Sequence, residues 1–251
     1  MTISFAGRHV VITGASRGIG FGIAEGFAAA GARLHLIAND SAVHTVAKAL
    51  GATAAEADIA DKAQVRTALA GLSRIDVLIN NAGLELMTPI EDSSDATSDA
   101  FARVIDINVG GTALMTAAAL DRMQAGSAII NTASIWGRVA EPRFGAYVAS
   151  KHAIIGLTKT WARELGPRGI RVNAVCPGWV RTEASMRSLG RIAQEAGRDP
   201  QAMLDDIVAG QALPGLMEPA DMAPTYLFLA SDLASNITGQ SLNVDRGEVP
   251  W

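Results

Sequence analysis

A tyrosine and a lysine stand four residues apart in the stretch Tyr147-Val148-Ala149-Ser150-Lys151. On a helix this spacing places both side chains on one face, with Cβ atoms about 5–6 Å apart. A free tyrosine ionises near pH ~10, so lowering its pKa by about 3 units requires roughly 4 kcal/mol of preference for the phenolate. An ammonium at about 4–5 Å supplies about 3–4 kcal/mol at an effective dielectric of about 20, but only about 1 kcal/mol in bulk water. The pair could therefore transfer a proton in a closed pocket, whereas on an open surface it would be an ordinary helix pair.

A glycine-rich turn, Thr13-Gly14-Ala15-Ser16-Arg17-Gly18-Ile19-Gly20, follows the apolar run 9–13 and precedes the helical pattern 21–30. This order directs backbone N–H groups and the positive end of a helix dipole to one place, which suits a phosphate. Gly14 would permit the tight turn, Gly18 a close approach to the backbone, and Gly20 the packing of the helix on the strand. The alternative is a glycine turn without a ligand, but the position after the first strand favours a phosphate site.

The end of the second expected strand, 33–38, bears on the identity of a dinucleotide. An Asp at this point would bind a 2′-hydroxyl and repel a 2′-phosphate. Here Ala38 holds the position, followed by Asn39 and Asp40. Arg17 could bind a 2′-phosphate with its forked donors, so both observations favour NADP over NAD. Asp40 acts against NADP if its side chain points inward, or else it caps the next helix.

Two further turns follow expected strands. Asp58 comes after the weak strand 53–57 and could accept a hydrogen bond from an adenine amine, or serve only as a turn or capping residue. Asn80-Asn81-Ala82-Gly83 comes after the buried strand 76–79. Asn and Gly suit tight turns, and small residues here would also let a ribose pass close to the backbone.

Asn108 and Ser134 are expected near the tyrosine. A long amphipathic helix, about 100–123, is interrupted at Asn108-Val109-Gly110-Gly111, a poor sequence for a helix interior. It predicts either a local bend that Asn108 holds and whose freed carbonyl binds water, or close helix packing at small residues. Ser134 lies just beyond the fifth strand, 127–132. Ligands of open α/β sheets bind outside the carboxyl ends of the strands, so Asn108, Ser134 and Tyr147 can reach one crevice.

The loop 135–146 could form one wall of a substrate pocket. The segment 179–214 is the longest stretch without strand character; its mixed charges predict a solvated helical face, and a segment of this length is often a lid. Cys176 is interpreted as a small buried hydrophobe, because no histidine lies nearby in sequence. The polar and aromatic candidates for the substrate pocket are Glu85, Trp136, Glu141, Trp179 and Arg181.

Strands and helices alternate to the end of the 251-residue chain without a linker or a change in composition. This pattern predicts an α/β fold: one doubly wound Rossmann domain spanning 1–251, with a parallel seven-stranded sheet and helices on both faces. With 49% hydrophobic and 18% charged residues, the composition allows a large buried core.

Composition also excludes several classes of protein. The net charge of −4 argues against a nucleic-acid binder or a basic membrane-surface protein. A single cysteine rules out an intrachain disulfide and fits a reducing compartment. The four histidines are scattered, so no metal site is expected. Without an apparent secretion signal or a run of about 18 apolar residues, we expect a cytoplasmic protein.

Over nearly its whole length the chain resembles the short-chain dehydrogenase/reductase family, in particular its alcohol, polyol and 3-oxoacyl reductase-like members. Seven features occur in the family's order, and their combination carries more weight than any one of them. They are Thr13-Gly14-x-x-x-Gly18-x-Gly20, Asp58, Asn80-Asn81-Ala82-Gly83, Asn108, Ser134, Tyr147-x-x-x-Lys151, and Pro177-Gly178 with Thr182.

The resemblance implies a catalytic role for four residues. Tyr147 would be the general acid in reduction and the base in oxidation, and Ser134 would polarise the substrate oxygen. Lys151 would lower the pKa of Tyr147 and bind the nicotinamide ribose, and Asn108 would hold a water that links Lys151 to solvent. The glycine turn would bind the pyrophosphate, and Val180 and Thr182 the carboxamide. The implied cofactor site is Gly14, Ser16, Arg17, Gly18, Ile19, Gly20, Asn39, Asp58, Ile59, Asn81, Ala82, Gly83, Tyr147, Lys151, Pro177, Gly178, Val180 and Thr182.

The expected function is therefore hydride transfer between NADP or NAD and a secondary alcohol or ketone, with a small polyol, sugar-derived or hydroxy compound as substrate. A carrier-bound 3-oxoacyl substrate is an alternative if Arg138, Arg143 and Arg181 converge at the entrance. A cofactor-sensing scaffold without turnover is a third possibility. Family members are commonly homotetramers. One departure is Asp245-Arg246-Gly247 where two glycines are usual, so the backbone or subunit packing is expected to differ there.

Overall fold

The computed structural model describes residues 3–250. The strands are β1 (His9–Thr13), β2 (Arg33–Ala38), β3 (Thr53–Glu56), β4 (Val77–Asn80), β5 (Ala128–Thr132), β6 (Arg171–Pro177) and β7 (Ser241–Val244). The α-helices are α1 (Gly18–Ala29), α2 (Ala42–Leu50), α3 (Lys62–Leu69), α4 (Asp95–Ile105), α5 (Thr112–Ala119), α6 (Gly145–Leu165), α7 (Glu183–Glu195), α8 (Pro200–Ala209) and α9 (Ala223–Ala230).

The strands form one seven-stranded sheet in the order β3-β2-β1-β4-β5-β6-β7. Every neighbouring pair is parallel, which confirms the predicted fold class. β1 pairs with both β2 and β4, so the strand order reverses there. In open parallel sheets such a reversal opens a crevice at the carboxyl ends of the strands.

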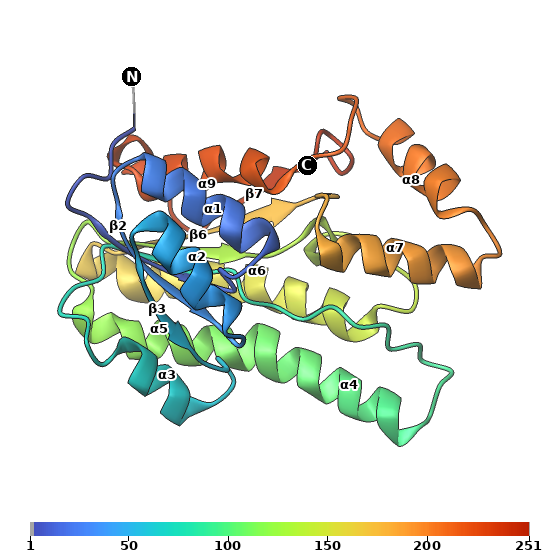
Figure 1. Cartoon of the computed structure of the whole chain (residues 1–251), viewed down its shortest axis with the longest axis horizontal. Coiled ribbons are helices and arrows are strands. Elements are labelled where there is room, and N and C mark those ends of the chain that lie inside the picture. Colours follow the sequence, from blue (N-terminus) through green and yellow to red (C-terminus); the bar gives the residue numbers. More distant parts are fainter. Residues whose placement is uncertain (1–2, 251) are drawn as a thin grey trace.

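Helices cover both faces of the sheet, as Figure 1 shows. Val10 and Ile12 of β1 belong to a core with α1, α2 and α9, whereas Val11 belongs to a second core with α3, α5 and α6. Successive residues of a strand point to opposite faces, so a strand buried on both sides reads as a continuous apolar run. This is why His9–Thr13 shows no polar alternation.

The long helix expected around 100–123 is interrupted where the sequence predicts. α4 begins at Asp95, after the side chain of Ser94 caps its N-terminus, and a π-helical turn, Asp106–Gly111 (η1), separates it from α5. A Cβ on Gly111 would lie 2.7 Å from Ile59 Cγ1. Gly111 thus lets the widened turn pack against the residue that follows Asp58.

The segment 179–214 contains two helices, α7 and α8, which lie beyond the end of the sheet in Figure 1. The C-terminal tail holds the end of this segment: Leu213 N donates to Arg246 O at 2.9 Å, and Arg246 Nη1 donates to Pro214 O at 2.6 Å. Arg246 has a φ of 56°, a conformation that favours glycine, so the departure at Asp245-Arg246-Gly247 marks an unusual backbone. None of the helices within residues 3–250 has the length and apolar character that crossing a membrane requires.

Candidate active site

A cavity of about 360 Å³ lies at the carboxyl ends of the strands. Its lining combines the glycine turn, the ends of β2, β4, β5 and β6, the first turns of α6 and the start of α7. All of the residues expected to bind the cofactor line this one cavity, and so do Ser134, Glu85, Trp136 and Trp179. Among residues 3–250 no group of three or more His, Cys, Asp or Glu side chains is arranged to hold a metal ion.

The glycine turn leaves open backbone at one end of the cavity. Gly14 has a φ of 65°, and a Cβ on it would lie 2.8 Å from Ala82 Cα. Asn81 Nδ2 donates to Thr13 O at 3.1 Å and to Gly14 O at 3.3 Å, which ties the turn to the end of β4. No side chain caps the N-terminus of α1, and its first turn holds no acidic residue. Helix N–H groups therefore face a crevice free of negative side chains in that turn, and these residues fit a dinucleotide pyrophosphate.

Asp40 adopts both of the roles considered for it. Its Oδ1 accepts from Ala42 N at 3.1 Å, at the start of α2. Its Oδ2 pairs with Arg17 Nη1 at 3.0 Å and accepts from Ser16 Oγ at 2.9 Å. The carboxylate therefore turns toward the glycine turn and partly neutralises the cation expected to meet a 2′-phosphate.

Asp58 is held in place by two partners. Its Oδ1 accepts from Ala60 N at 2.9 Å, and its Oδ2 pairs with the guanidinium of Arg103 from α4. A lone carboxylate at a strand end could turn away into solvent, whereas this one is fixed beside the cavity that it lines.

Tyr147 and Lys151 both lie on α6, and both line the cavity near Ser134. Lys151 is buried, and its Nζ donates to Thr132 O at 2.8 Å and lies 5.3 Å from the centre of the Tyr147 ring. Burial lowers the pKa of Lys151 to about 8, and the carboxylate of Glu85 acts in the opposite direction. Lys151 thus remains largely a cation at neutral pH.

The expected lowering of the Tyr147 pKa by Lys151 is not found in this arrangement. Burial raises the pKa of Tyr147, Glu85 raises it further, and a hydrogen bond with Ser134 lowers it in part. The reason is geometric: Lys151 directs its ammonium at the Thr132 carbonyl, and desolvation of the phenol dominates. A phenol that stays protonated at neutral pH is a proton donor, which suits the acid role.

Asn108 lies in the π-helical turn and joins three segments. Its Oδ1 accepts from Leu84 N at 2.7 Å, and its Nδ2 donates to Leu84 O at 2.9 Å and to Ser150 Oγ at 2.9 Å. It does not line the cavity but stands behind it, since a Cβ on Gly83 would lie 3.4 Å from Asn108 Oδ1 and 3.5 Å from Lys151 Nζ. Asn108 therefore fixes the loop after β4 against the helix that carries Tyr147.

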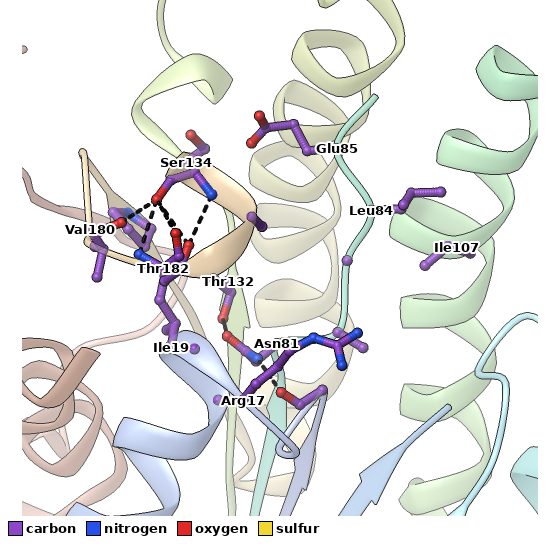
Figure 2. A pocket seen from close by; sticks show the side chains of 18 of the residues that line it. Arg17, Ile19, Asn81, Leu84, Glu85, Ile107, Thr132, Ser134, Val180 and Thr182 are labelled. Carbon is purple, nitrogen blue, oxygen red and sulfur yellow. Dashed lines mark hydrogen bonds between the residues drawn. The ribbon is translucent and has the colours of Figure 1, made fainter. Parts of the chain in front are cut away.

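Aromatic rings line the cavity beside Ser134, Tyr147 and Lys151. The ring centre of Trp136 lies 5.9 Å from that of Tyr147 and 6.2 Å from that of Trp179, both edge-on. Glu85 enters from the loop after β4, and in Figure 2 its carboxylate points toward the side of Ser134. Of the five candidates for the substrate pocket, Glu141 and Arg181 do not line this cavity.

The three arginines that could have met an acidic substrate do not converge. Arg143 pairs with Glu195 at 2.9 Å, and Arg181 pairs with Glu218 at 2.9 Å. Arg138 Nε donates to Asn243 Oδ1 at 2.7 Å, at β7. Each is directed at a different element, because sequence proximity to the site does not set where a long side chain finds its partner.

Several residues that contribute to the site could not be identified from the sequence. Thr132 acts through its backbone carbonyl, and Leu84 through its N–H and C=O, so their side-chain types are irrelevant. Ser188 of α7 comes close enough to Glu85 to lower the pKa of that carboxyl, although the two residues are about a hundred positions apart in the sequence. The start of α7 was identifiable, because Thr182 caps it by accepting from Ser185 N at 3.1 Å.

Comparisons with known proteins agree with this geometry. A family model described as Enoyl-(Acyl carrier protein) reductase matches residues 14–248. Oxidoreductase UcpA of Salmonella typhimurium is 39% identical, with 96% of this chain and 94% of that protein covered. The 3alpha-hydroxysteroid dehydrogenase of Mediterraneibacter gnavus is 33% identical over 98% of each chain. The D-beta-hydroxybutyrate dehydrogenase of Cupriavidus necator is 34% identical, with 97% of this chain and 98% of that one covered.

Solved structures show the same likeness over the whole fold. The crystal structure of levodione reductase has a TM-score of 0.89 and 30% identity, covering 97% of this chain and 98% of that chain. A short chain dehydrogenase from Burkholderia cenocepacia, solved in complex with NADP, has a TM-score of 0.85 and 29% identity, with the same coverage.

Proposed function

Because this chain belongs to the short-chain dehydrogenase/reductase family, we propose that it is an NAD(P)-dependent oxidoreductase that interconverts a secondary alcohol and a ketone. The observation that carries the proposal is the shared cavity. The open glycine turn lines one end of the cavity, and Ser134, Tyr147 and Lys151 line the other. A protein that only sensed a dinucleotide would need the glycine turn but not Ser134, Tyr147 and Lys151.

The proposed chemistry divides between the cofactor and the chain. A bound nicotinamide dinucleotide supplies or accepts the hydride. In reduction, Ser134 donates a hydrogen bond to the substrate carbonyl oxygen, and Tyr147 delivers its phenolic proton to that oxygen as negative charge develops. Lys151 keeps a positive charge beside the phenolate that remains, and Asn108 holds the loop and helix that frame these groups. In oxidation the same proton moves back to Tyr147.

We propose NADP as the preferred cofactor and a small substrate without an acidic group. The end of β2 carries Ala38 and Asn39 in place of an acid, and Arg17 lines the adenosine end of the cavity. The pairing of Arg143 and Arg181 with glutamates disfavours a carrier-bound or acidic substrate. A cytoplasmic homotetramer, the assembly that the family resemblance implies, completes the proposal.

The replacement Tyr147→Phe tests the enzyme assignment. It removes the proton donor and keeps the ring, so turnover should fall by about 10²–10⁴-fold on any ketone the wild type reduces. The dissociation constant for NADPH, measured by fluorescence titration, should change far less than turnover, because the glycine turn is untouched. Unchanged turnover in this variant would refute the assignment. A wild type that binds NADPH yet reduces none of a panel of polyol-derived, sugar-derived and β-keto compounds would point to a cofactor sensor.

A further inference from the structure

Glu85 lines the end of the cavity that holds Ser134, Tyr147 and Lys151. The proton transfer proposed above gives this carboxylate no role. It lies in the loop after β4, half-buried, and lines the cavity together with Tyr147 and Lys151. The preceding residue, Leu84, is held through both its N–H and its C=O by the side chain of Asn108. The backbone that carries Glu85 is therefore fixed relative to α6, and its carboxylate is not free to swing into solvent with the loop.

The surroundings of Glu85 define what it can bind. Burial raises the pKa of Glu85, whereas Ser188 of α7 and the cations Lys151 of α6 and Arg187 of α7 lie close enough to lower it. Arg187 is already paired with Glu183 at 2.7 Å, and Lys151 donates to Thr132 O. Glu85 affects the pKa of Tyr147, so its charge lies within electrostatic reach of the phenol that meets the substrate oxygen. A carboxylate has about four lone-pair sites, so one serine leaves it acceptor capacity to spare.

We propose, building on the function above, that Glu85 sets substrate specificity by binding an O–H or N–H donor adjacent to the reacting carbinol. The substrate class is then a vicinal diol, polyol or amino alcohol with the matching hydroxyketone or aminoketone, uncharged or cationic. A substrate that carries its own carboxylate would bring a like charge next to Glu85 in a partly desolvated cavity.

The aromatic part of the cavity lining fits the same class. Trp136 and Trp179 line the cavity and carry no hydrogen-bond acceptor, so Glu85 would accept from the second polar group of the substrate. Ring surfaces pack against C–H groups, and the rings and Glu85 together would orient a compact molecule with one polar edge. Buried polar groups left unpaired are costly, so a substrate lacking the second donor is discriminated against.

Four compounds that share a CH₃–CH(OH) group test the proposal: 2,3-butanediol, 3-amino-2-butanol, 2-butanol and 3-hydroxybutyrate. For the wild type, kcat/KM should be at least about tenfold higher for the diol and the amino alcohol than for 2-butanol, and lowest for 3-hydroxybutyrate. Glu85→Gln should lower the value for the amino alcohol most, by about tenfold or more. It should raise the value for 3-hydroxybutyrate several-fold relative to the value for 2-butanol, a ratio that cancels any effect of the change on Tyr147 itself. Glu25→Gln, an exposed change on α1 that removes the same charge, should leave the ranking as it is.

Glu85→Asp provides a second variant that keeps the charge and withdraws it by one methylene. It should lose the preference for the diol yet still discriminate against 3-hydroxybutyrate. The proposal is overturned if the wild type turns over 3-hydroxybutyrate or 2-butanol as well as the diol, or if the ranking survives in both Glu85 variants. If instead no ketone or alcohol is turned over by the wild type at all, the oxidoreductase assignment itself fails, which separates the two claims.

Discussion

At the scale of single residues, the spacing of the proposed reacting groups predicts their common helix face but not their electrostatics. The four-residue interval of Tyr147 and Lys151 predicts a shared helix face, and α6 provides it. The expected drop in the Tyr147 pKa fails, because the spacing says nothing about where the ammonium points or how dry the phenol is. The Thr132 carbonyl takes the ammonium, and burial raises the pKa of the phenol. Both depend on the folded surroundings and not on the helix.

We expect coenzyme preference to depend on two side chains. Asp40 pairs with Arg17 at 3.0 Å, and Arg17 is the cation that we expect to meet a 2′-phosphate. Arg17→Ala should weaken NADPH binding by about five- to fiftyfold and change NADH binding by less than about twofold. Asp40→Asn should strengthen NADPH binding several-fold, since it frees Arg17 and removes a negative charge, with dissociation constants measured by titration at fixed ionic strength.

The two replacements act in opposite directions, so together they exclude a general loss of folding as the explanation. Wild-type protein that binds NADH more tightly than NADPH, with no response to Arg17→Ala, would overturn the preference for NADP.

At the scale of elements, the sequence pattern predicts where strands and helices lie, but it does not predict which of them contact one another. The run Asp76–Ile79 and the glycine turn place β4 and α1 within two or three residues of their observed ends. Asn108-Val109-Gly110-Gly111 correctly marks the break between α4 and α5. Its main partner, Leu84, could not be predicted, because Asn108 binds a backbone 24 residues away whose side-chain type is irrelevant. Glu141 and Arg181 were candidates for the substrate pocket as polar residues, and they do not line the cavity.

We predict that the contact between the C-terminal tail and the segment 179–214 depends on pH through Glu248. Burial raises the pKa of Glu248 to about 7, with Asp245 and Glu141 adding negative charge around it and Gln211 Nε2 donating to it at 3.5 Å. A carboxyl whose pKa is higher folded than unfolded holds more protons in the native state between about pH 4.5 and 7. Its contribution to stability is therefore lost as the pH rises through that window.

Glu248→Gln should remove this dependence. Because the carboxyl is partly exposed, the gain at pH 8 is on the order of 1 kcal/mol, or about 2–4 °C in Tm for a chain of this size. At about pH 4.5 the variant and the wild type should melt together. Thermal unfolding followed by circular dichroism at both pH values checks this, and an equal Tm difference at the two values would contradict the assigned pKa.

At the scale of the whole molecule, the fold explains why distant residues meet. β1, β4, β5 and β6 end at the same edge of one parallel sheet, so Gly14, Asn81, Ser134 and Pro177 surround one cavity although they span most of the chain. The alternating pattern was enough to predict that edge, because right-handed connections between parallel strands leave few arrangements. The strand order brings the glycine turn and the end of β5 to the same edge, and α6 adds Tyr147 to the cavity there.

Isotope transfer from NADPH to a ketone is the direct test of hydride transfer in this cavity. Wild-type protein would be incubated with NADPH deuterated at the transferable position and with the ketone partner of each alcohol above, and the products examined by mass spectrometry. We expect the wild type to form an alcohol that carries one deuterium on its carbinol carbon, and Tyr147→Phe to form far less of it. Protein that binds NADPH normally but transfers no deuterium to any of these ketones would contradict this expectation.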